Sequence, residues 1–289
     1  MSDVATGSRA ARRGALADIP AEPGVAKPDP ILVADGVQRH FGGLTAVDVA
    51  HLEVARGAIT GLIGPNGAGK TTFFNVLSGF DDADRGAWTF DGEQTQGLAA
   101  YRVARRGMVR TFQLTKALSR MSVIENVKLG AAGQVGEGLW RSLVGPLWAD
   151  QEQRIEERAE QELARFNLAH MRDEYAATLS GGQRKLLEMA RALMAEPKLV
   201  MLDEPMAGVN PALTQSLLEH VLELPDRGMT VIFVEHDMDV VMHISDWVVC
   251  MAQGRIIAEG PPDSIGRNKA VIDAYLGRQH DEPTAQEGP

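Results

Sequence analysis

The chain has 289 residues, of which 44% are hydrophobic, so it can bury one large core with or without a smaller appendage. Its formal net charge of −10 argues against broad nucleic-acid binding, and its single cysteine, Cys250, excludes an internal disulfide framework. No apolar run approaches the roughly 18–20 residues of a membrane-spanning helix. The first thirty residues lack the apolar stretch of a signal peptide, so we expect a cytosolic protein. From the net charge, we expect no nucleic acid as a partner.

The N-terminal part predicts irregular chain followed by antiparallel strands. Residues 1–30 are rich in alanine, proline, glycine and charge without periodicity, which indicates a flexible arm. Residues 31–41 and 46–54 have the composition of strands, and Gly42 with Gly43 permits a turn between them. We therefore expect an antiparallel β subdomain.

The middle of the chain predicts a strand, a glycine loop and then a largely helical region. Residues 58–63 predict a buried strand, and residues 70–79 predict the helix that leaves the loop after it. Helices are also expected at 98–108 and 150–168, and a third follows "LSGGQ", where the apolar side chains share one face. This indicates a helical subdomain at about residues 114–195.

The C-terminal part returns to strands. Residues 198–205 and 229–237 are apolar on consecutive positions, as strands covered on both faces tend to be. Residues 246–260 predict a hairpin, and a flexible tail is expected at 278–289. The strands and helices together predict an α/β domain over residues 31–277.

One motif carries specific chemistry by itself. "GPNGAGKTT" matches the phosphate-loop pattern Gly-x-x-x-x-Gly-Lys-Ser/Thr between a predicted strand and a predicted helix. Its glycines let backbone N–H groups converge on an anion at a helix N-terminus, and Lys70 reaches the terminal phosphates of a nucleotide. The residues predicted to bind the nucleotide here, which the resemblance given below implies is ATP, are Gly64, Pro65, Asn66, Gly67, Ala68, Gly69, Lys70, Thr71 and Thr72.

Acidic residues that end an apolar strand complete the predicted nucleotide chemistry. Asp203 ends such a strand and is the expected magnesium partner, together with the Thr71 hydroxyl. Glu204 follows it, where a carboxylate can accept a proton from attacking water. His236 ends the next apolar strand in the same manner. The alternative for "DEP" is a solvated turn.

A second apparent phosphate cradle, "LSGGQ", lies more than a hundred residues after the first. Together the ordered motifs resemble the ATPase subunits of ATP-binding-cassette transporters; they are "GPNGAGKTT", "RTFQ", "LSGGQ", "LVMLDEP" and "VEHD". The resemblance implies a RecA-like phosphate-loop ATPase core that binds ATP and Mg²⁺. It also implies that two such domains face each other head to tail. The second cradle would then bind the ATP of a partner subunit through Ser180, Gly181, Gly182 and Gln183.

The resemblance implies further roles at single positions. Gln113 is similar to the glutamine that contacts magnesium and senses a membrane subunit, and His236 to the residue that holds the γ-phosphate and attacking water. Phe41 occupies the place of an aromatic ring that stacks on adenine, with a core position as its alternative. Asn210 stands where many members have aspartate.

Within the family, "FGGLTAV", "VRTFQL", "EHDM" and "DAYLG" resemble the ATPase subunits of branched-chain amino acid importers. This resemblance implies transmembrane permease subunits, a solute-binding protein and peripheral attachment to the inner face of the cell membrane. ATPases for urea or short amides, for lipopolysaccharide export, and for membrane complexes that transport nothing stay open as alternatives. The second ATPase subunit can be the same chain or a paralogue.

Two other classes of ABC protein fit the chain less well. ABC proteins that act in translation are expected to carry two cassettes, and this chain has one phosphate loop. ATPases of DNA repair or chromosome structure need a long coiled-coil insertion, and no sustained heptads appear.

For the transporter class, we expect the stretch after Gln113, with Leu118 and Met121, to receive a permease helix. The tryptophan segment 139–148 is either the edge of that groove or a local satellite of the core.

Overall fold

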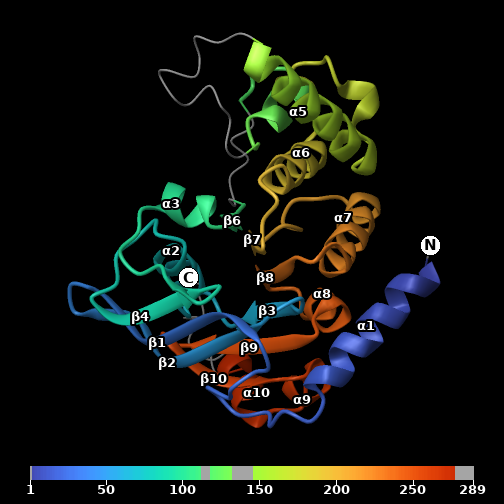
Figure 1. Cartoon of the computed structure of the whole chain (residues 1–289). Helices are drawn as coiled ribbons and strands as arrows, with labels where there is room; N and C mark the ends of the chain where they lie inside the picture. The colour runs from blue at the N-terminus through green and yellow to red at the C-terminus, as the bar shows by residue number, and fades with distance from the viewer. Residues whose placement is uncertain (1, 112–117, 132–145, 277–289) are drawn as a thin grey trace, which may run out of the picture. The chain divides into compact units, whose positions relative to one another are not determined.

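The computed structural model describes residues 2–111, 118–131 and 146–276 (Figure 1). The chain forms two compact units, of which unit 1 comprises Met1–Gly97 with Ile232–Pro289 and unit 2 comprises Leu98–Val231. No helix among the described residues is long and apolar enough to cross a membrane.

Unit 1 contains a four-stranded antiparallel sheet in the order β2-β1-β4-β5. Its strands are β1 (Pro30–Phe41), β2 (Leu44–Ala55), β4 (Arg85–Phe90) and β5 (Glu93–Gln94). Strands β1 and β2 pair in the register Val37↔Val49 across the predicted glycine turn, and both valines are buried. The predicted antiparallel subdomain is therefore confirmed, and β4 with β5 adds a hairpin that we did not predict.

A second sheet in unit 1 holds the strand that leads into the glycine loop. Strand β3 (Ile59–Ile63) is fully buried and pairs in parallel with β9 (Trp247–Ala252), which pairs antiparallel with β10 (Arg255–Gly260). The predicted hairpin turns at Gln253 and Gly254, both with positive φ. The helices of this unit beyond the arm are α2 (Lys70–Leu77), α8 (Met238–Ile244), α9 (Pro262–Ile265) and α10 (Lys269–Leu276).

The N-terminal arm is more ordered than its composition predicts. Residues Ser2–Leu16 form helix α1, because the alanines and arginines before the first proline favour a helix that the average over thirty residues conceals. Arg12 Nε lies 3.1 Å from Asp246 Oδ2, and Arg13 Nη2 donates to the Ser245 carbonyl at 2.6 Å. Long-range contacts thus hold a segment for which we expected irregular chain.

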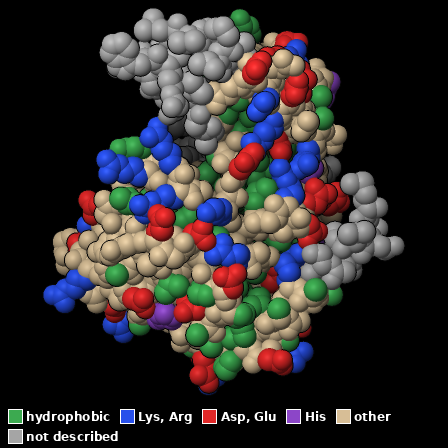
Figure 2. Space-filling view, in the orientation of Figure 1, with side chains coloured by type: hydrophobic (Ala, Val, Ile, Leu, Met, Phe, Trp, Pro, Cys, Tyr) green, Lys and Arg blue, Asp and Glu red, His purple; other side chains and the backbone are tan. Residues whose placement is uncertain are grey.

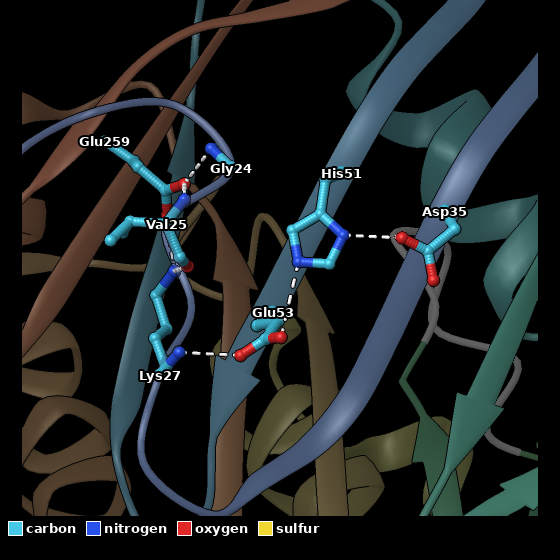
Figure 3. Close-up of polar contacts among 7 residues, drawn as sticks. All are labelled: Gly24, Val25, Lys27, Asp35, His51, Glu53 and Glu259. Carbon is cyan, nitrogen blue, oxygen red and sulfur yellow. Dashed lines mark hydrogen bonds and ion pairs between the residues drawn. The ribbon is translucent and has the colours of Figure 1, made fainter.

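The residues between α1 and β1 are anchored by a buried carboxylate. Glu259 Oε1 accepts from the Gly24 and Val25 N–H groups at 2.5 and 3.1 Å, and Glu259 Oε2 lies 2.6 Å from Lys27 Nζ (Figure 3). Both charged side chains of this pair are buried, which is tolerable because the carboxylate is fully hydrogen-bonded. The Lys27 backbone N–H also donates to the Glu53 carboxylate. His51, two residues before Glu53 on β2, contacts the same carboxylate (Figure 3).

Unit 2 combines short parallel strands with a helical cluster. Strand β6 (Met108–Arg110) pairs in parallel with β7 (Leu199–Asp203), and β8 (Thr230–Val234) begins in this unit. The helices are α3 (Ala100–Arg105), α4 (Val123–Lys128), α5 (Pro146–Arg165), α6 (Gly181–Leu193) and α7 (Pro211–Glu223). Short 3-10 turns occupy Ala169–Met171, Ala176–Thr178 and Pro225–Arg227.

The predicted helical region is present, and its core follows the expected apolar faces. Helices α4, α5 and α6 contact one another, and the predicted stripe on α6 is buried through Leu186, Leu187, Ala190, Leu193 and Met194. Helix α7 was not predicted. On the face shown in Figure 2, acidic and basic side chains of the described residues are interspersed. The parallel strands, antiparallel sheet and helices confirm the predicted α/β fold class.

Candidate functional site

The phosphate loop joins β3 to α2 in unit 1, and its glycines are required by close backbone packing. Gly64 has φ 144, and a Cβ there would lie 2.0 Å from the Met251 carbonyl oxygen. Gly69 has φ 100, and a Cβ there would lie 2.2 Å from the Ala46 carbonyl oxygen. Any side chain at either position would displace backbone, so the loop conformation depends on these two glycines.

Lys70 is folded over the loop to which it belongs. Its Nζ donates to the Gly64 carbonyl at 2.6 Å and to the Pro65 carbonyl at 3.1 Å. The Gly254 N–H donates to the Ala68 carbonyl at 2.9 Å, so the β9–β10 hairpin supports the middle of the loop. These contacts place an ammonium group and a helix N-terminus together, which is the chemistry that phosphate binding needs.

The residues of the phosphate loop differ in how far they are exposed to solvent. Gly64 and Ala68 are buried against the protein, whereas Asn66, Gly67 and Thr71 are exposed. Pro65, Gly69 and Thr72 are intermediate. The exposed residues are the ones that an incoming anion would meet.

Two further predicted residues lie in unit 1. The side chain of His236 is 65% exposed, and its Nδ1 lies 3.8 Å from the buried Glu235 carboxylate. Phe41 is 49% exposed, which excludes the alternative of a core position. The guanidinium of Arg39 lies 4.7 Å from the centre of the Phe41 ring, and Asp81 holds that guanidinium through a 2.7 Å bond to Nη2.

Asp203 and Glu204 lie in unit 2, at the end of β7. Asp203 is buried, and its Oδ2 accepts from Arg110 Nη2 at 2.7 Å. Its other oxygen, Oδ1, is buried without a hydrogen-bond partner, so it can still ligate a cation or a cation-bound water. Glu204 has φ 48, an uncommon conformation for a non-glycine residue, and Lys185 Nζ donates to its carbonyl at 3.0 Å. The alternative of a solvated turn is wrong for Asp203.

The predicted signature residues form the N-terminus of α6. Ser180 Oγ accepts from the Gln183 N–H at 3.3 Å, and Gln183 Oε1 accepts from the Ser180 N–H at 2.9 Å, which completes a capping box. A Cβ at Gly182 would lie 2.0 Å from Leu213 Cδ2, whereas a Cβ at Gly181 would meet nothing within 4 Å. A side chain at position 182 would thus displace the Leu213 side chain, whereas Gly181 leaves open space at the helix start.

Gln113 and most of the tryptophan segment lie outside the described residues. The described part of unit 2 nevertheless contains a cleft of about 290 Å³. Its lining comes from α3, β6, the residues after α4, and α6, and comprises Ala104, Val109, Arg110, Thr111, Leu129, Gly130, Glu188, Arg191, Ala192 and Ala195.

Among the described residues, the side chains that contact predicted site residues and that sequence reasoning missed include Arg39, Arg110, Lys185 and Tyr275. Tyr275 on α10 accepts a hydrogen bond from the Gly64 N–H at 2.9 Å. All four lie within or beside a quoted motif, Tyr275 in "DAYLG", but a single arginine, lysine or tyrosine has no pattern that reveals its partner. The contact of Tyr275 joins positions 211 residues apart, so no local signal could have revealed it.

Comparison with known proteins agrees with this geometry. A family model described as "ABC transporter" matches residues 47–207, and one described as "Branched-chain amino acid ATP-binding cassette transporter" matches residues 255–281. The probable branched-chain amino acid transport ATP-binding protein LivG of Archaeoglobus fulgidus is 42% identical over 252 residues, covering 87% of this chain and 97% of LivG. The high-affinity branched-chain amino acid transport ATP-binding protein BraF of Pseudomonas aeruginosa is 40% identical, covering 86% and 98%.

Solved structures give the same assignment. The ADP conformation of an ATP-binding cassette of an ABC transporter superposes with a TM-score of 0.74 at 36% identity, covering 86% of this chain and 100% of that one. A nucleotide-free ATP-binding cassette from an ABC transporter gives 0.73 at 36% identity, covering 85% and 98%. The predicted RecA-like ATPase core is confirmed by these neighbours. The chain therefore belongs to the ABC transporter family, as one of its ATP-binding cassette ATPases.

Proposed function

We propose that this chain is the ATP-hydrolysing subunit of an ABC importer for branched-chain amino acids. The phosphate loop carries the ATPase part of the proposal, because Lys70 and two sterically required glycines form a built anion cradle. The relatives named as branched-chain amino acid transport proteins support the substrate, as does the second family match at residues 255–281.

The chemistry divides between residues with different tasks. The loop and Lys70 bind the phosphates, and Phe41 stacks on adenine. Glu204 accepts the proton of the attacking water, and His236 holds the γ-phosphate and that water. The capping-box hydrogen bond of Ser180 leaves the hydroxyl its own proton, which it can offer to an anion.

Magnesium fits the residues present. The buried Oδ1 of Asp203, which has no hydrogen-bond partner, is the kind of oxygen ligand that Mg²⁺ prefers, and Thr71 offers an exposed hydroxyl. These two residues with Gln113 would hold the ion. When bound, it would neutralise charge on the phosphate oxygens.

A second cassette, either this chain or a paralogue, completes each site in the proposal. Ser180, Gly181, Gly182 and Gln183 then serve the ATP bound by the partner's phosphate loop. The open space at Gly181 supports this arrangement, because an anion can approach the α6 N-terminus there.

Permease subunits anchor the cassette to the inner face of the cell membrane in this proposal, and a solute-binding protein delivers substrate to them. The cleft in unit 2 offers a place for a short permease helix, and Leu118, close to it in the chain, is 47% exposed. Thr111 of the cleft and Leu118 lie on either side of Gln113 in the sequence, and Gln113 would pass the closing of the ATPase dimer to the permease.

The ATPase assignment is tested by separating binding from turnover. Lys70→Ala should abolish ATP binding, because the loop loses its only ammonium. Glu204→Gln should bind ATP without hydrolysing it, and should run as a dimer in ATP and a monomer without it. Steady-state hydrolysis and size-exclusion chromatography measure both. Normal hydrolysis by Glu204→Gln would remove the general-base assignment.

The shared site is tested by mixing two inactive variants. Gly181→Asp places a negative charge at the partner's phosphates, and its Cβ meets no atom of its own unit within 4 Å. Mixed with Lys70→Ala, it should form one intact site and one doubly damaged site, so part of the activity should return. A mixture that forms mixed dimers but stays inactive would show that "LSGGQ" acts within its own chain.

The substrate is tested in cells that lack this protein and its paralogues. Uptake of leucine, isoleucine and valine should fall, and the wild-type gene but not Glu204→Gln should restore it. Normal branched-chain uptake would favour urea, amide or lipopolysaccharide transport instead, and would leave the ATPase assignment standing.

A further inference from the structure

A side chain from the C-terminal helix contacts the phosphate loop of unit 1. The Tyr275 hydroxyl accepts the Gly64 N–H at 2.9 Å, and the carbonyl of the same glycine accepts Lys70 Nζ at 2.6 Å. One residue therefore lies between the phenol of α10 and the ammonium that binds phosphate.

This glycine has little freedom to move without its partners. Its φ of 144 places the site of a Cβ 2.0 Å from the Met251 carbonyl on β9. Strand β9 thus blocks one side of Gly64, and the Tyr275 hydroxyl fixes the direction of its N–H group. If that hydrogen bond were lost, the Ile63–Gly64 peptide could rotate and change the φ of Gly64. The next peptide, whose Gly64 carbonyl accepts Lys70 Nζ, would shift with that change.

The hydroxyl is also suited to a place beside phosphates. Burial raises the pKa of Tyr275, so the phenol stays protonated and uncharged at neutral pH. A neutral hydroxyl can accept the glycine N–H without repelling a nucleotide, as a carboxylate at the same place would.

We propose that Tyr275 is a positioning residue of the phosphate loop, which holds the backbone of Gly64 on its N–H side and so steadies the carbonyl that Lys70 contacts, and that helix α10 thereby sets the affinity of the loop for polyphosphate. The inference rests on the proposed nucleotide function of this loop. It gives a specific task to the C-terminal segment, which the second family match covers separately from the ABC transporter match.

The test removes one oxygen atom. Tyr275→Phe keeps the ring and loses the acceptor. Tyr101→Phe is the matched control, because the Tyr101 hydroxyl also accepts a hydrogen bond, from Arg102 Nε at 3.0 Å. Tyr101 lies on α3 of unit 2. Isothermal titration should show about 3- to 10-fold weaker binding of ATP by Tyr275→Phe. Inorganic tripolyphosphate, which has no base, should be weakened by the same factor, and Tyr101→Phe should bind both as the wild type does.

A second measurement separates positioning from general stability. Hydrogen exchange in a peptide that contains Gly64 should be faster in Tyr275→Phe, whereas exchange in the β1–β2 hairpin should be unchanged. Unchanged affinity for both ligands, or uniform loosening of unit 1, would overturn the inference. Failure of the wild-type chain itself to bind ATP would instead overturn the proposed function.

Discussion

Arg110 and Asp203 form a buried ion pair between β6 and β7, with Nη2 and Oδ2 2.7 Å apart and side chains only 4% and 2% exposed. Removing one partner of a buried pair leaves a charge without compensation. Arg110→Met should therefore lower the free energy of unfolding by about 3–5 kcal/mol in urea denaturation. Lys128→Met, which breaks a partly exposed pair with Glu156, should cost no more than about 1 kcal/mol. Equal losses would show that the Arg110 pair is not specially stabilising.

Glu204 adopts a left-handed backbone conformation with φ 48, which favours glycine. Glu204→Gly should be more stable than Glu204→Ala by about 1 kcal/mol, and both should be inactive in hydrolysis because both lack the carboxylate. The same pair of substitutions at exposed Glu157, inside helix α5, should show the opposite order by about 1 kcal/mol. Thermal unfolding of the four variants measures these differences in stability. The same order at both positions would contradict a strained Glu204.

Arg39 covers the Phe41 ring at 4.7 Å and is held there by Asp81. If Phe41 stacks on adenine, then Arg39→Ala should weaken ATP binding by about 2- to 5-fold through a less well-positioned ring. Tripolyphosphate binding should not change, since it involves no base. Arg56→Ala, which removes exposed ion pairs with Asp29 and Asp91, is the control. Equal weakening of ATP and tripolyphosphate would place the role of Arg39 at the phosphates.

Leu118 is exposed, and the buried amide of Asn126 fixes its backbone, with Oδ1 accepting the Leu118 N–H at 2.9 Å. Leu118→Asp, or a charged residue at Met121, should leave the basal ATPase activity of the isolated subunit intact and abolish co-purification with permease subunits. Asn126→Ala should weaken co-purification in the same assay, because the segment loses its anchor. Gln153→Asp on the exposed side of α5 should do neither. Unchanged co-purification of the Leu118 variant would move the docking surface elsewhere.

Cys250 lies buried on β9, and burial raises the pKa of its thiol to about 12. The thiolate is therefore scarce at about pH 8, and the native chain should not react with a thiol-specific disulfide reagent until it is unfolded. Because the folded pKa exceeds the unfolded value of about 8.5, this thiol's stabilising contribution is complete below that value and declines as the pH rises above it. Cys250→Ala should flatten the alkaline fall in stability. Rapid labelling of the native chain would contradict the burial of the thiol.

The local motifs of this protein were predictable because their chemistry depends on contiguous residues. A phosphate loop needs its glycines and lysine within one turn, and the turn at Gly42 and Gly43 needs only backbone freedom. The exposed ring of Phe41 and the buried carboxylate of Asp203 exclude the alternatives of a core position and a solvated turn, and their roles toward adenine and magnesium stay predictions. Ser180 and Gly181 were recognised from five letters, although which ATP they serve stays a prediction.

The order of the N-terminal arm could not be predicted from its composition. Lys27 is held by Glu259, which lies 232 residues later, and Arg12 by Asp246, which lies 234 residues later. Distant carboxylates thus satisfy donors of the arm, and composition does not record such partners.

What the sequence determined by itself was a phosphate-loop motif and the family to which the chain belongs; the acidic partners of that loop stay a prediction. Tertiary structure alone decided which side chains support those groups. Arg110 meets Asp203 across 93 residues, and Tyr275 meets Gly64 across 211. Anion binding is encoded in one short loop, because neighbouring N–H groups create it. The stiffness of that loop comes from contacts that exist only after the chain has closed on itself, because loop closure brings distant donors and acceptors together.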